Sequence, residues 1–454
     1  MTPERGHVGQ SSGPERRGAV LIVTMWVLIV LAGIVMALAA NVQVEADCTA
    51  GDASRAQAEA IEAGAVQYVF SRADNLKGKM PMDTDMPAEG VRLGEGAFWI
   101  IRSTPDDDRL QGYGLVDEAS KLNLNTATAG MLSLLPGMTS ELAACALDWR
   151  DSDDTTTDAG AEGDYYRSLA DPYRAKNAPF ETVEELLLVR GFTREILYGE
   201  DVNRNGILDS GEDASADGSL TRGPGSFLTL YSQEPNTDAD GHARVNVNDP
   251  TQSTALTDAL TAKLSAQTAA LVRSRVRFGR PFRNLVDFYL RSGLKQADFD
   301  LVADKLTTRT EKTLNGLVNL MTAPREVLAA LPGLEESDVT ALLAARAGLT
   351  DPPASMAWLT TALKPAKAVA IADRVTLKTW QFSADIVSIA GDGRAFRRTR
   401  VVVDARKSPP KVIFRQPLTH LGWPLEETIR ARLRAGVAID TVCSEKHSVK
   451  TSTP

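Results

Sequence analysis

Apolar residues are distributed unevenly along the chain, and one N-terminal run stands apart from the rest. Residues 19–40 read AVLIVTMWVLIVLAGIVMALAA, without a single charge. At 1.5 Å per residue this run makes about 33 Å of helix, enough to cross a hydrocarbon core of roughly 30 Å. Arg16 and Arg17 precede it, and Glu45 and Asp47 follow it. The positive-inside rule therefore predicts one membrane span, with the N-terminus cytoplasmic and the bulk of the chain across the membrane.

The helical pattern continues beyond the apolar run. Residues 45–72 contain helix formers and no proline, and small or apolar residues recur every three or four positions from Ala53 to Phe70. This spacing places them on one helical face. We therefore expect one helix of about 54 residues, roughly 80 Å long. Its first half would lie in lipid, and its second half would pack on a soluble domain.

Short strand patterns occur at two places that are far apart in the sequence. Residues 98–102 and 114–116 form the first group, and residues 380–389 and 400–403 form the second. We expect an α+β fold in which these strands form one small antiparallel, pilin-like sheet against the long helix, with a large α-helical insertion between them. The expected segments are the helix at 19–72, the first part of the sheet at 73–118, the insertion at 119–375, the last strands at 376–407 and a C-terminal tail at 408–454.

The insertion contains a weak internal repeat. The three copies begin LNLNTA at 122–127, VNVNDP at 245–250 and LVNLMTAP at 317–324. Two of them continue to Leu-Pro-Gly, at 135–137 and 331–333, a turn that suits two consecutive helices. These copies resemble helix-hairpin-helix modules, which often bind DNA phosphates at a helix N-terminus.

The charges around these turns disfavour nucleic acid. The turns of the two Leu-Pro-Gly copies carry Met138, Glu141, Leu334, Glu335 and Glu336 and no Lys or Arg. The whole chain has 50 Lys and Arg against 59 Asp and Glu, a net charge of −9. A protein that binds phosphate backbones needs the opposite balance. We therefore interpret the repeats as packing or partner-recognition modules.

A twelve-residue stretch in the insertion fits the EF-hand calcium loop. It reads DVNRNGILDSGE from residue 201 to 212, with glycine at the sixth position for the sharp turn. Oxygen ligands in this number suit Ca²⁺ better than zinc or copper. No helical pattern follows, so we expect an isolated structural loop. The expected ligands are Asp201, Asn203, Asn205, the carbonyl of Ile207, Asp209 through water, and Glu212.

A second acidic cluster lies earlier in the insertion. It comprises Asp151, Asp153, Asp154, Glu162 and Asp164. These carboxylates would repel one another unless solvent or a cation separated them. Paired carboxylates could instead serve glycoside hydrolysis, which leaves a secreted hydrolase as an alternative class. No HExxH, P-loop or GxGxxG motif accompanies them, so we expect no enzyme.

Cysteine and histidine add little to this picture. The three cysteines, Cys48, Cys145 and Cys443, lie far apart, and an odd number cannot all pair within one chain. The sequence does not show whether any two of them form a disulfide. The four histidines stand in unrelated contexts, which disfavours a histidine-rich metal site.

The N-terminus resembles a type IV prepilin signal. Arg16-Arg17-Gly18 stands directly before the apolar run, and in such signals a prepilin peptidase cuts after the glycine. The resemblance implies a leader at residues 1–18 and a cut between Gly18 and Ala19. Most pilins have glutamate at the fifth mature position, whereas this chain has Val23. That departure is typical of the minor pseudopilin K of type II secretion systems.

The stretch from Asp148 to Gly191 resembles the most recognisable part of this family, which carries an α-helical insertion in its sheet. The resemblance implies calcium in the insertion, and it extends that role to the second acidic cluster. It also implies an inner-membrane protein that interacts with prepilin peptidase, the major pseudopilin and the other minor pseudopilins. Because Val23 cannot neutralise the terminal ammonium of a subunit above it, the expected place is the tip of a short pseudopilus. The alternative is a DNA-binding, pilin-like competence protein.

Overall fold

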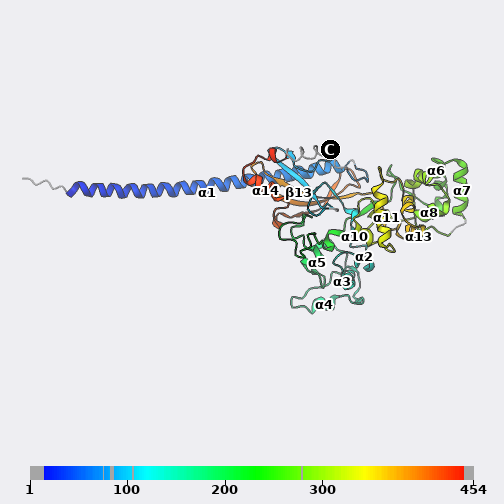
Figure 1. Ribbon diagram of the computed structural model, residues 1–454. Coiled ribbons are helices and arrows are strands. Elements are labelled where there is room, and N and C mark those ends of the chain that lie inside the picture. Colours follow the sequence, from blue (N-terminus) through cyan, green and yellow to red (C-terminus); the bar gives the residue numbers. More distant parts are fainter. Residues whose placement is uncertain (1–14, 75, 82–85, 105–106, 278–279, 444–454) are drawn as a thin grey trace, which may run out of the picture.

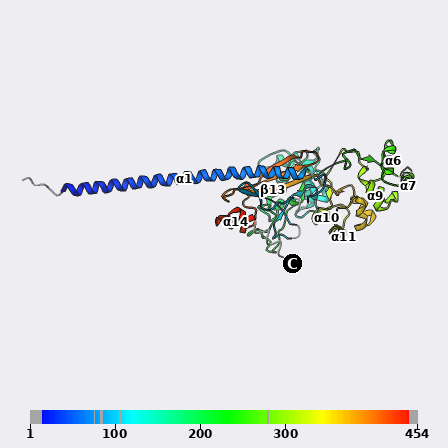
Figure 2. The ribbon, with the colours of Figure 1, turned by 90° about the horizontal axis from the view of Figure 1, so that it is seen from above.

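The computed structural model describes residues 15–74, 76–81, 86–104, 107–277 and 280–443. Its most prominent element is helix α1, Glu15–Ala73, of 59 residues. Figures 1 and 2 show its first half extending away from the body of the protein. The large apolar side chains from Val20 to Val44 are exposed there, whereas Ala58, Ile61, Ala65 and Val69 are buried against the sheet. The long helix predicted from the sequence is confirmed, and the predicted cut between Gly18 and Ala19 falls inside it.

The sheet has seven strands, and every pairing within it is antiparallel. Its order is β1-β2-β13-β14-β15, with β3 paired to β2 and β4 to β13. Strands from before and after the insertion thus lie side by side, and the predicted α+β fold is confirmed. The strands are β1 Val91–Leu93, β2 Gly96–Arg102, β3 Gly112–Tyr113, β4 Val116–Asp117, β13 Gln381–Ile389, β14 Phe396–Asp404 and β15 Lys411–Pro417.

The C-terminal tail differs from the prediction. The sheet does not end at residue 407, because β15 adds a further strand beside β14. Residues Leu425, Ile429 and Leu433, around helix α14 (Glu427–Arg434), then pack on Trp99 and Val387. Side chains alternate between the faces of a strand, so the sheet has two apolar faces. Helix α1 covers one of them and the tail covers the other.

A buried carboxylate fixes how α1 sits on the sheet. Glu62 lies in the packed half of α1 and is fully buried. Its oxygens accept bonds from Arg397 Nε at 2.8 Å and Arg415 at 2.6 Å, on β14 and β15 respectively. A buried charge is tolerated only when it is paired and hydrogen-bonded. This pairing therefore specifies one register of the helix along the two strands.

The insertion contains three modules, each closed by a short parallel strand pair. The first module spans residues 122–229, the second 245–307 and the third 318–376. These pairs are β5 Leu122–Asn123 with β6 Leu228–Thr229, β8 Val245–Asn246 with β9 Leu306–Thr307, and β11 Val318–Asn319 with β12 Val375–Thr376. Between modules, β7 Gln233–Pro235 pairs with β10 Thr313–Asn315 in an antiparallel ladder.

Each module begins with two helices joined by a short turn. The first module contains α2 Ala129–Leu132, α3 Ser140–Arg150, α4 Gly163–Arg167 and α5 Arg194–Tyr198. The second contains α6 Ser253–Thr261, α7 Ala266–Arg277, α8 Leu285–Ser292 and α9 Gln296–Val302. The third contains α10 Arg325–Ala329, α11 Glu336–Ala347, α12 Leu359–Ala362 and α13 Pro365–Ile371. Short 3-10 helices occur at Glu118–Ser120, Val183–Leu188, Pro224–Phe227, Pro250–Gln252, Ala303–Lys305, Met356–Trp358 and Thr419–Leu421.

Equivalent hydrogen bonds recur in these modules. The amide of Asn125 bonds both the N–H and the carbonyl of Phe180, and Asn248 does the same with Phe282. Arg150 donates to the carbonyls of Leu124 and Ala127. Arg346 in the third module donates to Leu320 and Ala323. The sequence repeat thus has a structural counterpart in bonds that satisfy buried backbone groups.

The modules differ in what they pack against. The first and third share one large apolar core, whereas the second has its own core, which includes Ala357 of the third. Asn284 ties the second module to the third through the carbonyl of Val369, at 2.8 Å. Figures 1 and 2 place the second module, with α6 and α7, at the end of the molecule opposite the free half of α1.

Candidate functional site

The loop at 201–212 folds around its own acidic side chains. Asp201 Oδ1 and Oδ2 accept the N–H groups of Asn205 and Gly206, each at 3.0 Å. Asp209 Oδ2 accepts from the amides of Asn203 and Asn205, at 2.6 and 2.8 Å. Asn203 Oδ1 accepts the N–H of Asn205, and Asn205 Oδ1 accepts that of Ile207. The predicted ligand side chains are therefore brought together, and no helix directly follows the loop in the described chain.

Glu212 closes the loop from its far end. Its Oε1 accepts the N–H of Val202 at 3.0 Å, and its Oε2 accepts that of Asp209 at 3.1 Å. Burial raises the pKa of Asp201, although the N–H of Gly206 and the charge of Arg398 oppose it. Burial also raises the pKa of Glu212. Two buried carboxylates that resist ionisation are what a bound divalent cation would stabilise, so these residues fit Ca²⁺.

Gly206 has a steric role as well as a conformational one. Its φ is +79°, in the left-handed region. A Cβ there would lie 2.1 Å from Ser103 Oγ and 2.9 Å from Ser103 Cα, just after strand β2. A larger residue would push the loop away from the sheet. The glycine required by the loop motif thus also allows the loop to touch the sheet.

The second acidic cluster is assembled differently from the prediction. Oxygens of Asp148, Asp151 and Glu162 all lie within 4.8 Å of one another. The prediction named Asp151 and Glu162 but omitted Asp148, which is fully buried and accepts from Thr157 Oγ1 at 2.7 Å. In the sequence, an acidic residue near the end of the apolar pattern of α3 was the signal that could have identified Asp148.

The other three predicted residues lie outside this group. Asp153 is exposed and accepts the N–H of Thr155, Asp154 bonds Asn177, and Asp164 pairs with Arg167 at 2.5 Å. These local partners satisfy their carboxylates at the surface. Of the five predicted residues, the structure thus groups Asp151 and Glu162 with Asp148 and leaves the other three at the surface.

This three-carboxylate group contains buried oxygens without partners. Both oxygens of Glu162 and Oδ1 of Asp151 accept no hydrogen bond from the described residues. Burial, followed by repulsion from Asp148 and Asp151, raises the pKa of Glu162 to about 7. Burial also raises the pKa of Asp151. Orphaned acceptors of one charge fit a hard cation such as Ca²⁺, which takes oxygen ligands in this way.

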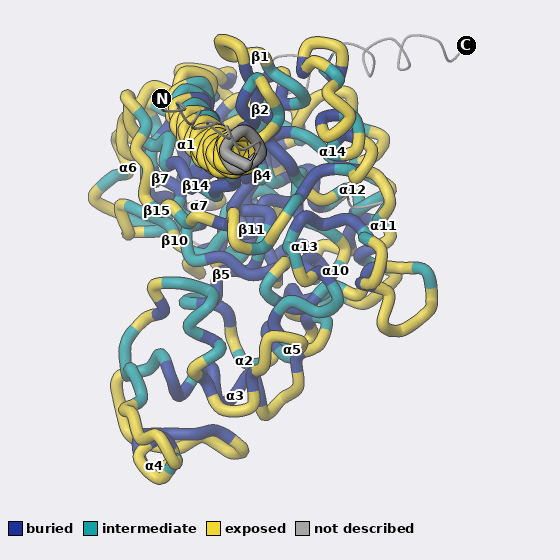
Figure 3. Tube along the Cα trace, turned by 90° about the vertical axis from the view of Figure 1, so that its left-hand side faces the viewer, coloured by how far each residue is buried: buried dark blue, intermediate teal, exposed yellow. Residues whose placement is uncertain are grey.

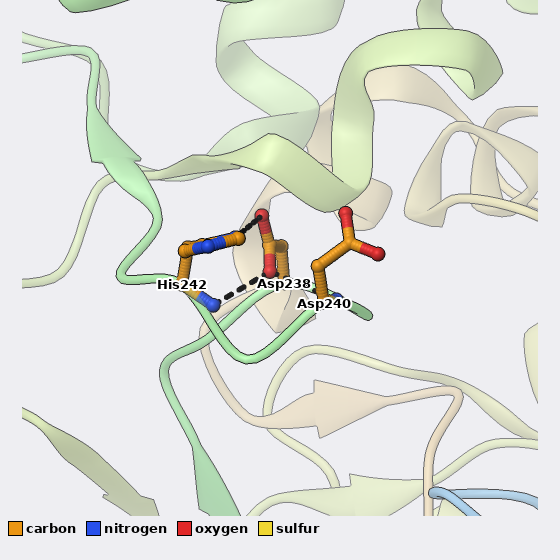
Figure 4. A group of neighbouring side chains, drawn as sticks. All are labelled: Asp238, Asp240 and His242. Carbon is orange, nitrogen blue, oxygen red and sulfur yellow. Dashed lines mark hydrogen bonds and ion pairs between the residues drawn. The ribbon is translucent and has the colours of Figure 1, made fainter.

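A third acidic group has a different character. Asp238, Asp240 and His242 lie together in a tight turn (Figure 4), and the sequence analysis did not single them out. Lys305 Nζ lies 2.7 Å from a carboxylate oxygen of each aspartate. Its hydrogen bonds to Asp238 and Asp240 raise the pKa of the lysine. The ammonium thus takes the place that a metal would need, and this group is a structural turn.

The membrane-facing features lie on α1. Helix α1 contains the only stretch in the described chain that is long and apolar enough to cross a membrane, and its most apolar part is unburied. Figure 3 shows this half of the helix exposed along its length. Val23 is 60% exposed and offers no carboxylate. Residues 1–14 of the expected leader lie outside the described residues.

The cysteines form no disulfide in the structure. Cys48, Cys145 and Cys443 are all free.

Comparison with known proteins finds a family match over part of the first module. Residues 116–198 match the family described as type II secretion system (T2SS), protein K, and this segment contains the whole stretch from Asp148 to Gly191. The family expected from the sequence is thus confirmed there. No curated protein matches the chain. A solved structure is also similar, described as the GspK-GspI-GspJ complex from the enterotoxigenic Escherichia coli Type 2 Secretion System. It is 14% identical, with a TM-score of 0.32, over 80% of this chain and 95% of that chain.

Proposed function

We propose that this chain, which the match over residues 116–198 identifies as a type II secretion system protein K, is a minor pseudopilin at the tip of the pseudopilus. It would initiate or cap assembly for the export of folded proteins across the outer membrane, as a structural component and not as an enzyme. The family match carries this proposal. The architecture agrees with it, because the anchor helix α1 packs on a small antiparallel sheet.

The membrane arrangement follows from α1. We place the span at residues 19–40 in the inner membrane, with the N-terminus cytoplasmic and the sheet and modules periplasmic. After a cut at Gly18, Ala19 would carry the new ammonium. In a filament surrounded by apolar helices, an ammonium without a counter-ion is costly. Val23 offers the next subunit no carboxylate, which supports a position with no subunit above it. The other minor pseudopilins and the major pseudopilin would be its neighbours below.

Calcium enters the proposal through the loop at 201–212. Bound there, the ion would neutralise the buried carboxylates and hold the loop closed. Closing the loop would also affect the sheet, because fully buried Arg398 of strand β14 contacts the loop. Arg398 donates to the carbonyls of Asn203 and Arg204, at 2.5 and 2.7 Å, and to the carboxylate of Asp385, at 2.8 and 2.9 Å.

The same loop also contacts the C-terminal tail. The amide of Asn205 donates to the carbonyl of Pro424 at 3.1 Å, and Gln111 donates to the carbonyl of Asn205 at 3.3 Å. Leu425, the next residue, is buried on the outer face of the sheet. We propose that calcium in this loop fastens the first module to both the sheet and the tail, and that the Asp148 group holds a second ion within the module.

Mass spectrometry of the mature N-terminus tests the first part. Co-expression with a prepilin peptidase should remove residues 1–18, and the cut chain should copurify with other minor pseudopilins. Changing Gly18 to Ala should block the cut while leaving the helix in the membrane. A chain that keeps Met1, or one cut beyond residue 40, would contradict the pseudopilin assignment.

A further inference from the structure

One segment of the chain is basic, although the chain as a whole is acidic. Between Asp258 and Asp287 there are six Lys and Arg residues and no Asp or Glu, in a chain whose net charge is −9. Five of the six are arginines. Arg presents a planar fork of donors that matches carboxylates and is enriched at protein interfaces, whereas Lys is depleted there. The composition of this segment is therefore that of a recognition surface for anions.

The structure leaves most of these charges free. Lys263, Arg273, Arg280 and Arg283 are exposed on or beside α7 and at the start of α8. We refer to these four residues as the basic face. Across the residues that the structure describes, none of the four cationic groups makes an ion pair. Arg275, in contrast, donates to the carbonyl of Ser292 at 2.8 Å and helps build the module.

The first and third modules serve as an internal comparison for the charge of the second. Where they have Gly137 and Gly333 in the turn before the second helix, the second module has Lys263. The first turns of α3 and α11 contain acidic residues, Glu141 in α3 and both Glu336 and Asp338 in α11, whereas the first turn of α7 contains none. An acidic residue at that place stabilises a helix through its dipole. The second module lacks that benefit and accumulates cations, so its charge does not follow from the shared architecture.

Acids elsewhere in the second module offset this charge only in part, with six Asp and Glu against nine Lys and Arg. Asp287, which ends the segment, is engaged by Arg291 at 3.1 Å, and Asp258, which precedes it, is exposed on α6. Leu271, two positions before Arg273, is 48% exposed but points to another side of α7, so it is not part of the basic face. Three of the four exposed cations are arginines, a composition closer to that of a protein interface than to that of a solvated lysine run.

The position of the module indicates what could reach this face. The second module lies at the end of the molecule opposite the free half of α1 (Figures 1 and 2). In a membrane-anchored filament tip, that end would meet periplasmic proteins first. We infer that the basic face is a docking site for a folded partner protein with a carboxylate-rich surface. This inference rests on the proposed function for the location of the face, but not for its charge.

Binding of labelled poly-L-glutamate to the full-length, calcium-loaded protein in detergent tests the inference. A variant with Lys263→Glu, Arg273→Glu, Arg280→Glu and Arg283→Glu should bind at least about tenfold more weakly, and added salt should weaken wild-type binding. The matched control reverses four other exposed basic residues, Arg194, Lys364, Lys407 and Lys411, and thus has the same net charge. It should bind like the wild type.

Two outcomes would overturn the inference. Equal loss in both variants would show a response to net charge alone. A DNA duplex of equal total charge that binds at least about tenfold more tightly than poly-L-glutamate would assign the face to nucleic acid instead. Cleavage at Gly18 and copurification with other minor pseudopilins, measured on the same variant, should be unchanged. A failed assembly of the wild type would count against the proposed function and not against the basic face.

Discussion

The first and second modules have the same architecture but opposite charge. Residues 122–229 contain 19 Asp and Glu against eight Lys and Arg, whereas residues 245–307 contain six against nine. Both keep the parallel strand pair and the asparagine that bonds a phenylalanine backbone. The shared architecture therefore depends on apolar positions and buried backbone bonds, while the polar positions are free to diverge.

The two modules also place their charges differently. In the first, acidic oxygens converge in buried groups that have raised pKa values. In the second, the cations of the basic face are exposed and make no ion pair with the described residues. Buried like charges need a counter-ion to be stable, whereas exposed ones need only water. The first module is thus suited to hold an ion and the second to meet a partner.

The largest effect is expected from a substitution that breaks the connection between the first module and the sheet. Arg398→Met leaves Asp385 with Arg400 alone and frees the carbonyls of Asn203 and Arg204. Removing one member of a buried ion pair costs about 3–5 kcal/mol. Hydrogen exchange should show faster opening of the 201–212 loop and β14, with the second module unchanged. The control, Arg394→Met, removes an exposed contact at 3.9 Å and should cost less than about 1 kcal/mol. Equal effects would refute the connection.

Calcium should stabilise the first module and not the second. With calcium at about 100 to 1,000 times its Kd, the free energy of unfolding should rise by about 3–4 kcal/mol. Adding a chelator should lower the Tm, and Asp201→Asn should remove most of the difference. Asp258→Asn changes an exposed aspartate of α6 in the second module and serves as the control. Calorimetric titration that finds no binding in the wild type would reject the calcium assignment.

The group of Asp148, Asp151 and Glu162 predicts a pH dependence of stability in the calcium-free protein. The pKa of Glu162 is about 7 in the folded state, against an ordinary value of 4.5. Between these values the folded protein holds a proton that the unfolded chain has released. Stability from this group is therefore complete below about pH 4.5 and is lost as the pH rises through 7. Thermal melts from pH 5 to 8 should show this loss, and Glu162→Gln should flatten it. With calcium bound, the dependence should weaken or reverse, because the ion requires ionised carboxylates.

The smallest expected effect concerns the turns that distinguish the modules. Gly333 has a φ of +77°, and a Cβ added there would meet no atom within 4 Å, so Gly333→Ala should cost about 1–2 kcal/mol through backbone conformation alone. The backbone of Lys263 has no positive φ. Lys263→Ala should therefore leave stability within about 0.5 kcal/mol while weakening the basic face. Thermal melts of both variants distinguish these cases, and a large loss for Lys263→Ala would give that lysine a structural role.

Several features of the fold could be predicted because their signal is local. The helix of α1 follows from residue type and spacing over one continuous stretch, and strands β2 and β13 follow from short apolar patterns. The loop at 201–212 could be recognised because its ligands are contiguous. Asp148 could not be assigned in the same way, since its grouping with Glu162 depends on the fold of residues 149–161 between them.

The sequence by itself determined the anchor helix, the interrupted sheet, the repeat and the loop motif, since each is encoded in neighbouring residues or in a fixed period. Only the tertiary structure decided that Arg398 donates hydrogen bonds to the loop at 201–212, that the tail covers the second face of the sheet, and that Lys305 pairs with Asp238 and Asp240. These are contacts between residues far apart in the chain. Their geometry depends on how whole elements pack, which no local pattern specifies.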